Sequence, residues 1–441
     1  MMRTVFAPVI FIGIYIANVV GTHPNLSMDQ NDPVEFEHRM LRNSLDIDPR
    51  TIITKSTPGD FTYSNLRALG GGLRFDWTNL YDHTVMSPLA RVIDYYQNPP
   101  NACARPVQKT NVNLQRLTIP SSGLGSSLHL YARHLCHAYD QKEVLVLEYP
   151  TAGVHWEWTD QRYCSAHDAP LACYFGNHES LRACDFTEEE WYTLTVGVPI
   201  DQAMKTDWNY FDTVGGCTFV DRDFESFARA DGSNVPAGMT PRDFNQHIVD
   251  DHRTTLQQWN AAAMEYLFQS VKPIVVQEAH RQLLDMFPRG IVPPNLVTVH
   301  IRWGDKGSEM ELAGISEYLV ATQNIIGDGW DTEPQHIYLA TEDPLAIQEF
   351  KAQMSPNWTV YVSGPTTANA KTTGPGKGAV QTEGQDGLDS LAALLISLEA
   401  DKYVLTTESN WSRLINELRK NVVDRRCGDC TVMFDVRPGE W

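Results

Sequence analysis

Five ionisable side chains follow an apolar stretch in the segment Val297 to Glu309, VTVHIRWGDKGSE. They are His300, Arg302, Asp305, Lys306 and Glu309. An arginine guanidinium presents a planar fork of N–H donors that matches phosphoryl oxygens, and a neighbouring lysine adds a second cation. A nearby carboxylate can take a proton from a hydroxyl group. The segment therefore predicts an anion clamp beside a candidate base, although a solvated loop with an ion pair would use the same residue types.

Two further apolar stretches in this half of the chain end in polar groups, at ATEDP from Ala340 to Pro344 and at TTESN from Thr406 to Asn410. If all three stretches are strands of one parallel sheet, they end at the edge where ligands of such sheets bind. The backbone N–H groups of Ser409 and Asn410, at the start of a predicted helix, could supplement Arg302 in binding phosphate.

Carboxylates at Glu342, Asp343 and Glu408 could accept hydrogen bonds from sugar hydroxyls or from the ring N–H and amino groups of guanine. An arginine clamp, a helix N-terminus and acceptor carboxylates at one sheet edge together predict a nucleoside-diphosphate site.

The elements that must position these groups alternate between strand and helix from Leu296 onward. The predicted strands are residues 296–302, 336–341, 358–362 and 402–407, and the predicted helices are residues 311–326, 343–354, 388–400 and 409–420. A loop rich in glycine and threonine separates the third strand from its helix, from Gly364 to Gly387. This alternation predicts a parallel, Rossmann-like domain of four strands.

An earlier part of the chain carries a second α/β pattern. The stretch from Leu117 predicts an apolar strand, a turn at Gly123 to Gly125, an amphipathic helix to about Tyr139 and a strand at Val144 to Leu147. Residues 151–240 are rich in Trp, Cys, His and Gly with little helical period, which predicts long disulfide-tied loops. Their aromatic rings could bind a sugar or could simply be packed. Two helices are predicted next, roughly at 250–269 and 273–286.

The composition excludes some classes of partner. Thirty-five Lys and Arg against fifty-five Asp and Glu give a net charge of −20. Such a charge repels nucleic acid and anionic membrane surfaces, so an anionic ligand must be held by a local cluster of cations.

The N-terminal residues predict entry into the secretory pathway. Thr4 to Val20 is an uncharged apolar run behind Arg3, slightly short of the roughly 20 residues of a spanning helix. A signal anchor is favoured over a cleaved signal peptide because no clean small-x-small cleavage site follows. Sequons at Asn25, Asn357 and Asn410 agree with lumenal exposure.

Eight cysteines form an even set that suits an oxidising compartment. The CGDC sequence at Cys427 to Cys430 could be a redox pair or half a zinc site. There is neither a second pair nor a thioredoxin-like context, so a structural disulfide is the favoured interpretation.

Three motifs in order resemble those of the α-1,6-fucosyltransferases, which include animal core-fucosylating enzymes and bacterial nodulation-factor enzymes. They are HIRWGDKGSEMELAGISEYLV, IYLATEDP and EADKYVLTTESNWSRLINEL. The protein O-fucosyltransferases are similar more loosely. The resemblance covers about Leu296 to Arg419, and GLGSSLH, from Gly123 to His129, resembles the glycine-rich turn of the family's first domain.

The resemblance implies fucose transfer from GDP-fucose to a glycan, an N-glycan core among the candidates, with inversion at the anomeric carbon and no cofactor or metal. By position, Arg302 would hold the β-phosphate of the leaving GDP and His300 would touch the nucleotide. Asp305 and Lys306 would order the loop, and Glu309, with Lys306 beside it, would be the catalytic base. The further donor-binding positions implied are Gly123, Gly125, Tyr318, Asp343, Ser409 and Asn410.

The sequence also departs from the family pattern. Trp303 replaces a second arginine, and Ala393 falls near an aspartate that contacts guanine, for which Asp389 one turn earlier could substitute. Leu405 and Ser412 replace a cysteine pair. The resemblance therefore predicts the class of sugar donor better than the class of acceptor. A protein O-fucosyltransferase stays a competing hypothesis.

Two rival hypotheses of a different kind stay open. Asp221-x-Asp223 is the pattern by which metal-dependent glycosyltransferases hold Mn²⁺, although no glycine-rich nucleotide domain surrounds it. A non-catalytic lumenal lectin or scaffold with the same fold is the second rival.

The fold class expected is α/β, a GT-B-like glycosyltransferase of two domains with an N-terminal membrane anchor. The predicted organisation is a signal anchor or signal peptide at 1–21, a stem at 22–60, an acceptor-side α/β domain at 61–290 and a Rossmann-like GDP-sugar domain at 291–441. The expected location is the Golgi membrane, in single-pass type II orientation, and the expected partners are GDP-fucose and a glycan or glycoprotein acceptor.

Overall fold

The computed structural model describes residues 72–82, 84–98, 113–117, 123–141, 143–147, 156–164, 170–176, 257–303, 311–363 and 377–438. All of them belong to the second of two compact units, Met1–Ile47 and Asp48–Trp441. The predicted anchor, the stem and Asp221-x-Asp223 lie outside the described residues. Within the described ranges, no helix has the length and apolarity required to cross a membrane.

A five-stranded parallel sheet forms the C-terminal part, in the order β5-β4-β3-β6-β7. Its strands are β3 (Val297–His300), β4 (Gln335–Ala340), β5 (Trp358–Ser363), β6 (Lys402–Leu405) and β7 (Val432–Asp435). The four predicted strands are confirmed. The expectation of only four was wrong, because β7 adds a short edge strand whose side chains alternate between half-buried and exposed.

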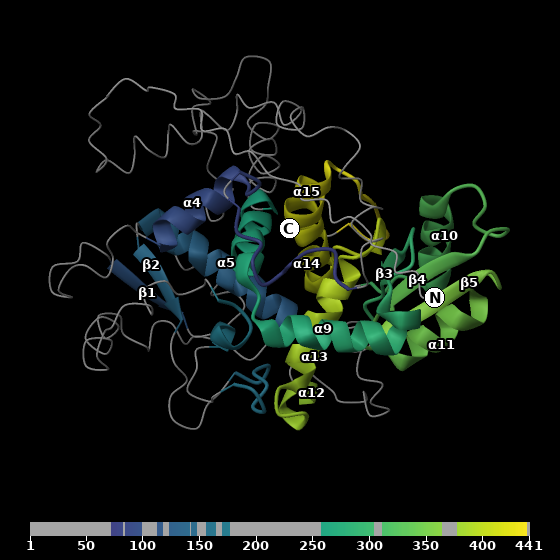
Figure 1. Cartoon of the computed structure of the whole chain (residues 1–441), viewed down its shortest axis with the longest axis horizontal. Coiled ribbons are helices and arrows are strands. Elements are labelled where there is room, and N and C mark those ends of the chain that lie inside the picture. Colours follow the sequence, from purple (N-terminus) through teal and green to yellow (C-terminus); the bar gives the residue numbers. More distant parts are fainter. Residues whose placement is uncertain are drawn as a thin grey trace, which may run out of the picture. The chain divides into compact units, whose positions relative to one another are not determined.

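Helices connect the strands in chain order (Figure 1). They are α10 (Ile315–Ile326), α11 (Pro344–Gln353), α12 (Lys377–Gln381), α13 (Gln385–Ser397), α14 (Asn410–Leu418), a π-helical turn at Arg419–Asp424 and α15 (Arg425–Cys427). Helix α10 starts four residues later than predicted because the Glu317 carboxylate accepts from the N–H of Gly314 and fixes the start there. Helix α12 lies in the segment predicted to be a loop.

The predicted β–turn–α–β unit is present in the first region, but its first strand lies earlier than predicted, because β1 (Asn113–Leu117) ends at the residue where the predicted strand begins. Strand β1 pairs in parallel with β2 (Glu143–Leu147), and α5 (Leu124–Gln141) connects them. Because α5 already begins at Leu124, Gly125 lies in its first turn and not in the preceding loop. Helix α4 (Pro88–Gln97) precedes this unit, with the Ser87 hydroxyl as its N-cap.

The two predicted linking helices are also present. Residues 257–267 are helical, and α9 (Pro273–Met286) follows with the predicted bounds. Helix α9 packs along α13, and Figure 1 shows the two side by side. The Gln282 side chain donates to the Asp389 carbonyl across this contact.

Two hydrophobic clusters stabilise these elements. The smaller cluster lies between the sheet and α10 and α11, and its members include Val299, Tyr318 and Phe350. The larger cluster combines buried residues of the first region, such as Trp77 and Trp259, with α13 and α14 residues such as Leu391. Burial of such large apolar side chains contributes about 1.5–3 kcal/mol each.

Two pairs of cysteines form disulfides in the part of the chain that the structure describes. Cys164 pairs with Cys173, and Cys427 pairs with Cys430. Trp156 is buried and Trp158 packs against the larger cluster, so these two rings of the cysteine-tied region are packed structure and not an exposed sugar platform.

Candidate functional site

The three polar clusters predicted from the sequence lie at the ends of neighbouring strands. Strand β3 is central, with β4 on one side and β6 on the other, and all three run in parallel. Their carboxyl ends therefore meet at one edge, which brings Arg302, Glu342 and the turn before α14 into one neighbourhood.

Arg302 follows β3 and forms an ion pair with Glu342 at the end of β4. The arginine side chain is 16% exposed and the glutamate side chain is 68% exposed. One guanidinium nitrogen of Arg302 also donates to the Trp303 carbonyl at 3.3 Å. A pair with one partner in solvent contributes little stability, so another anion can replace Glu342 at low cost.

His300 is buried at the end of β3, and its Nδ1 lies 2.6 Å from the Ser412 hydroxyl. Burial, with a smaller contribution from the charge of Arg302, lowers the His300 pKa to about 3. The imidazole is therefore neutral. Ser412 also accepts from the backbone N–H of Thr406 at 3.1 Å, so His300 ties β3 to the turn between β6 and α14.

Trp303, the main departure from the family pattern, has a definite structural role. Its indole N–H donates to the Ala313 carbonyl at 2.8 Å, and its ring packs against the smaller hydrophobic cluster. This bond holds together the two ends of the segment 304–310. That segment, with the predicted Asp305, Lys306 and Glu309, lies outside the described residues, so their roles stay predictions.

The start of α14 is held by several bonds from protein groups. The Ser409 N–H donates to the Thr406 carbonyl at 2.9 Å, so it is engaged in a turn rather than turned toward a ligand as predicted. The Asn410 side-chain amide donates to the Ser126 hydroxyl at 2.8 Å. Arg413 donates to the Thr407 carbonyl and to Asn410 Oδ1, and burial lowers its pKa. Donor contacts by Ser409 and Asn410 stay predictions.

Asp343 and Tyr318 also have structural roles. Asp343 is the N-cap of α11, where its Oδ1 accepts from the backbone N–H groups of Leu345 and Ala346. Tyr318 is fully buried on α10, and burial raises its pKa to about 12. A side chain with no exposed surface can support the strand ends from behind, and a direct donor contact by Tyr318 stays a prediction.

The glycine-rich turn of the first region meets the start of α14. A β-carbon on Gly125 would lie 3.3 Å from the backbone of Asn410 and Trp411, so a larger residue would force α5 and α14 apart. The Gly123 carbonyl accepts from the Ser127 N–H. The structure thus brings Gly125 next to Asn410, and the donor contacts of Gly123 and Gly125 stay predictions.

Asp389, the suggested substitute for the missing family aspartate, lies on α13 at its contact with α9. Burial raises the Asp389 pKa to about 6, and the neighbouring Glu278 carboxylate adds to the shift. The Ala393 carbonyl accepts from the Tyr338 hydroxyl. These contacts give both positions a packing role, and a guanine contact by Asp389 stays a prediction.

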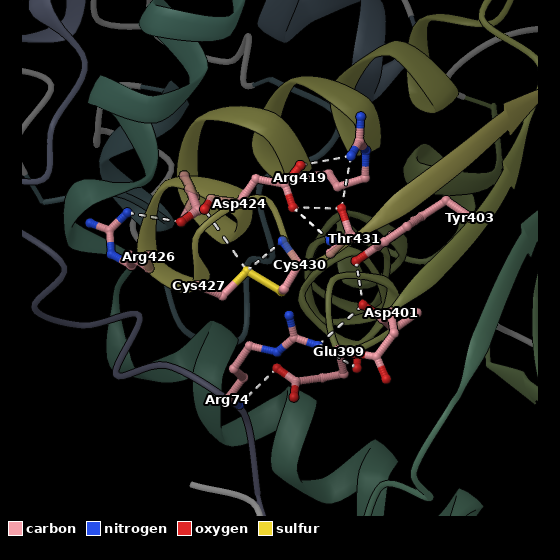
Figure 2. Close-up of a disulfide and its surroundings, with 12 residues drawn as sticks. Arg74, Glu399, Asp401, Tyr403, Arg419, Asp424, Arg426, Cys427, Cys430 and Thr431 are labelled. Atoms are coloured by element: carbon pink, nitrogen blue, oxygen red, sulfur yellow. Dashed lines mark hydrogen bonds and ion pairs between the residues drawn. A yellow bond between two sulfur atoms is a disulfide. The ribbon is translucent and has the colours of Figure 1, made fainter. Parts of the chain in front are cut away.

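One group of described side chains has metal-ligand chemistry: Asp424, Cys427 and Cys430. The two sulfurs are joined in a disulfide, and Asp424 is hydrogen-bonded to Arg419 and Thr431 (Figure 2). This settles the CGDC sequence in favour of a structural disulfide over half a zinc site. Independence of the reaction from metals stays a prediction.

Sequence reasoning missed one set of contacts near the site. His129 on α5 and Glu417 on α14 form a buried pair, with His129 Nε2 at 3.1 Å from both carboxylate oxygens. The two residues are 288 positions apart, so no local pattern could have indicated the pair.

Comparisons with known proteins find distant likenesses among solved structures. No family model matches the chain, and no curated protein matches it. Among solved structures it is similar to the NodZ α-1,6-fucosyltransferase soaked with GDP-fucose, at 11% identity and a TM-score of 0.34. The likeness covers 69% of this chain and 91% of that chain. A TM-score this low assigns neither fold family nor activity, so the proposal below depends on the site residues and sequence motifs.

Proposed function

We propose that this protein is a glycosyltransferase that moves fucose from GDP-fucose to a glycan, with inversion and without a metal. The observation that carries the proposal is the position of Arg302 at the end of the central strand, paired with a solvent-exposed carboxylate that a diphosphate can displace. The ordered motifs resembling the α-1,6-fucosyltransferases support GDP-fucose as the donor.

The chemistry that this position favours is stabilisation of the leaving group. Departure of GDP builds negative charge on the β-phosphate, and a fixed guanidinium stabilises that charge most in the transition state. The neutral His300 and the Trp303–Ala313 bond hold the strand end and the loop ends in place. In the proposed mechanism Glu309 takes the proton of the acceptor hydroxyl, with Lys306 beside it.

The test uses the full-length protein and titrates GDP by calorimetry in the presence of a chelator. We expect binding without a divalent cation, and we expect Arg302→Ala to abolish it together with slow hydrolysis of GDP-fucose. Arg281→Ala, which removes a 57% exposed arginine on α9, is the matched control and should bind as the unmodified protein does. Normal turnover by Arg302→Ala would refute the donor-site assignment, and strict dependence on Mn²⁺ would favour Asp221-x-Asp223 instead.

The acceptor class is proposed from the resemblance alone. An N-glycan core with α-1,6 linkage is the first candidate, and a Ser or Thr of a folded protein domain is the second. Incubation of the protein with GDP-fucose and an array of both acceptor types separates them. A protein that binds GDP but transfers to neither would be the lectin or scaffold.

We also propose a Golgi lumenal location behind an N-terminal anchor. In that compartment Asn357, in an exposed turn before β5, should carry a glycan. Asn410 should not, because it is half-buried where the start of α14 packs against α5. Peptide mapping after enzymatic deglycosylation measures both sites, and an unmodified Asn357 would argue against lumenal exposure.

A further inference from the structure

A buried pair of ionisable side chains joins α5 to α14. His129 Nδ1 lies 2.8 Å from the Gly125 carbonyl oxygen, and His129 Nε2 lies 3.1 Å from each carboxylate oxygen of Glu417. The side chains are only 10% and 4% exposed. Water is therefore a minor partner for either group.

The hydrogen-bond partners fix how many protons the pair holds. A carbonyl oxygen only accepts, so Nδ1 must carry a hydrogen, and an ionised carboxylate also only accepts. Either Nε2 is protonated as well, or the proton resides on Glu417 and Nε2 accepts from it. In both cases the pair holds one proton more than a neutral imidazole with a carboxylate. Without that proton, two lone-pair groups would face each other in a buried contact.

The same contact brings together the starts of both helices. Gly125, whose carbonyl accepts from His129, is packed against the backbone of Asn410 and Trp411. One residue further on, Ser126 accepts from the Asn410 side chain at 2.8 Å. The start of α14 follows the end of β6, which is beside the strand that carries Arg302. Loosening the helix contact would therefore disturb the edge of the candidate site.

We propose that His129 and Glu417 are positioning residues whose shared proton holds the start of α5 against the start of α14, so that loss of the proton weakens binding of a nucleoside diphosphate. The identity of the ligand rests on the proposed function. The proton-dependent contact between the helices does not.

Charged groups also lie around the pair. Among the described residues, Arg413 on α14 and Lys420 in the π-helical turn interact electrostatically with Glu417, and Arg133 on α5 interacts with Arg413. His300, which faces α14 from β3, is neutral. On the other helices that contact α5, Asp94 of α4 accepts from Tyr81 and Asn98, and Glu265 of the helix at 257–267 accepts from the Ser87 N–H.

Glu417→Gln separates a proton-dependent contact from a merely structural one. The amide N–H of glutamine can donate to a neutral His129, and its carbonyl oxygen can accept from a protonated one, so the variant needs no extra proton. We expect the GDP affinity of the unmodified protein to fall by about tenfold as the pair loses its proton, over the pH range in which the protein stays folded. Glu417→Gln should bind with a flat profile over the same range.

Three further variants complete the experiment. His129→Gln should bind GDP about tenfold more weakly at every pH, because it removes the ring that bridges Gly125 and Glu417. His280→Gln on α9 and Glu333→Gln before β4 alter exposed residues, and both should keep the pH profile of the unmodified protein. Equal slopes for Glu417→Gln and the unmodified protein would overturn the proposal.

Hydrogen exchange without ligand tests the contact when GDP does not bind at all. The amides at the starts of α5 and α14 should lose protection as the pH rises, after correction for intrinsic exchange, and Glu417→Gln should retain it. If GDP fails to bind but this difference is seen, the proposed function falls and the positioning pair stands. Identical protection in both proteins would overturn the pair.

Discussion

Two arginine–carboxylate pairs at the parallel sheet show how similar residue types serve different ends. Arg302 and Glu342 meet at the ends of β3 and β4, and Glu342 is largely exposed. Arg419 and Asp424 meet 2.8 Å apart beside the disulfide, with side chains that are 7% and 8% exposed. Figure 2 shows Arg419, Asp424 and Thr431 together beside the disulfide.

The difference lies in how fully each carboxylate is bonded. Asp424 accepts from Arg419, from the Thr431 N–H at 3.1 Å and from the Thr431 hydroxyl at 2.6 Å. Arg419 also donates to Asn416. A buried network with this many bonds fixes the π-helical turn and β7, whereas the Arg302 pair can exchange its exposed partner for a ligand. The number of hydrogen bonds that each carboxylate accepts therefore distinguishes the structural pair from the candidate functional pair.

Removing the carboxylate of the buried network should give the largest effect. Asp424→Ala leaves Arg419 as a buried, uncompensated charge, and we expect a loss of about 3–5 kcal/mol in the free energy of unfolding. Urea denaturation of the full-length protein measures it. Asp331→Ala, at an exposed position, should lie within about 0.5 kcal/mol of the unmodified protein. A similarly small loss for Asp424→Ala would remove the contrast between the two pairs.

Changing Arg302 in the Arg302–Glu342 pair should lower the catalytic rate and leave the stability nearly unchanged. Arg302→Lys keeps the charge but replaces the planar fork by a point charge, so we expect kcat to fall by about 100-fold. The free energy of unfolding should change by less than about 1 kcal/mol. Initial rates with GDP-fucose and urea denaturation check the two expectations. A variant that unfolds easily, with normal kcat, would place Arg302 among the structural residues.

Removing the hydrogen bond between Trp303 and Ala313 should give an intermediate effect. Trp303→Phe keeps most of the packed ring but leaves the Ala313 carbonyl without its N–H donor, which costs about 1 kcal/mol of stability. Because that bond joins the residues on either side of the segment that contains the proposed base Glu309, we expect kcat to fall more than KM rises. Trp330→Phe, which removes another partly buried indole ring, is the control. A change in KM alone would mean that Trp303 contributes to binding instead.

A further effect concerns the pH dependence of stability. Asp389 has a pKa near 3.8 when unperturbed and about 6 in the folded chain, so the folded state binds the proton more tightly. Its contribution to stability is therefore complete below about pH 4 and is lost as the pH rises through about 6. Asp389→Asn should flatten the stability profile between these values and raise stability at neutral pH. Urea denaturation across the range measures it, and an unchanged slope would contradict the assignment.

Local patterns in the sequence predicted most of the C-terminal part. Apolar runs and helical periods located β3, β4, β5, β6 and the helices between them, and the parallel alternation placed the three polar clusters at one edge. Strand β7 was missed because it has only four residues, Val432 to Asp435. At the edge of the sheet its side chains alternate between exposed and half-buried, so the sequence shows no clear apolar run. The π-helical turn was missed because it depends on bonds from Arg419 to Asp424 and Thr431.

The sequence by itself determined which residue types stand at each strand end, because side-chain periodicity and strand direction are local properties of the chain. Only the tertiary structure decided which of those groups are already bonded. Ser409 uses its N–H in a turn, Asp343 caps a helix, and Trp303 holds the loop ends. The His129–Glu417 pair arises only when distant helices pack, because its partners are supplied by the fold and not by neighbouring positions.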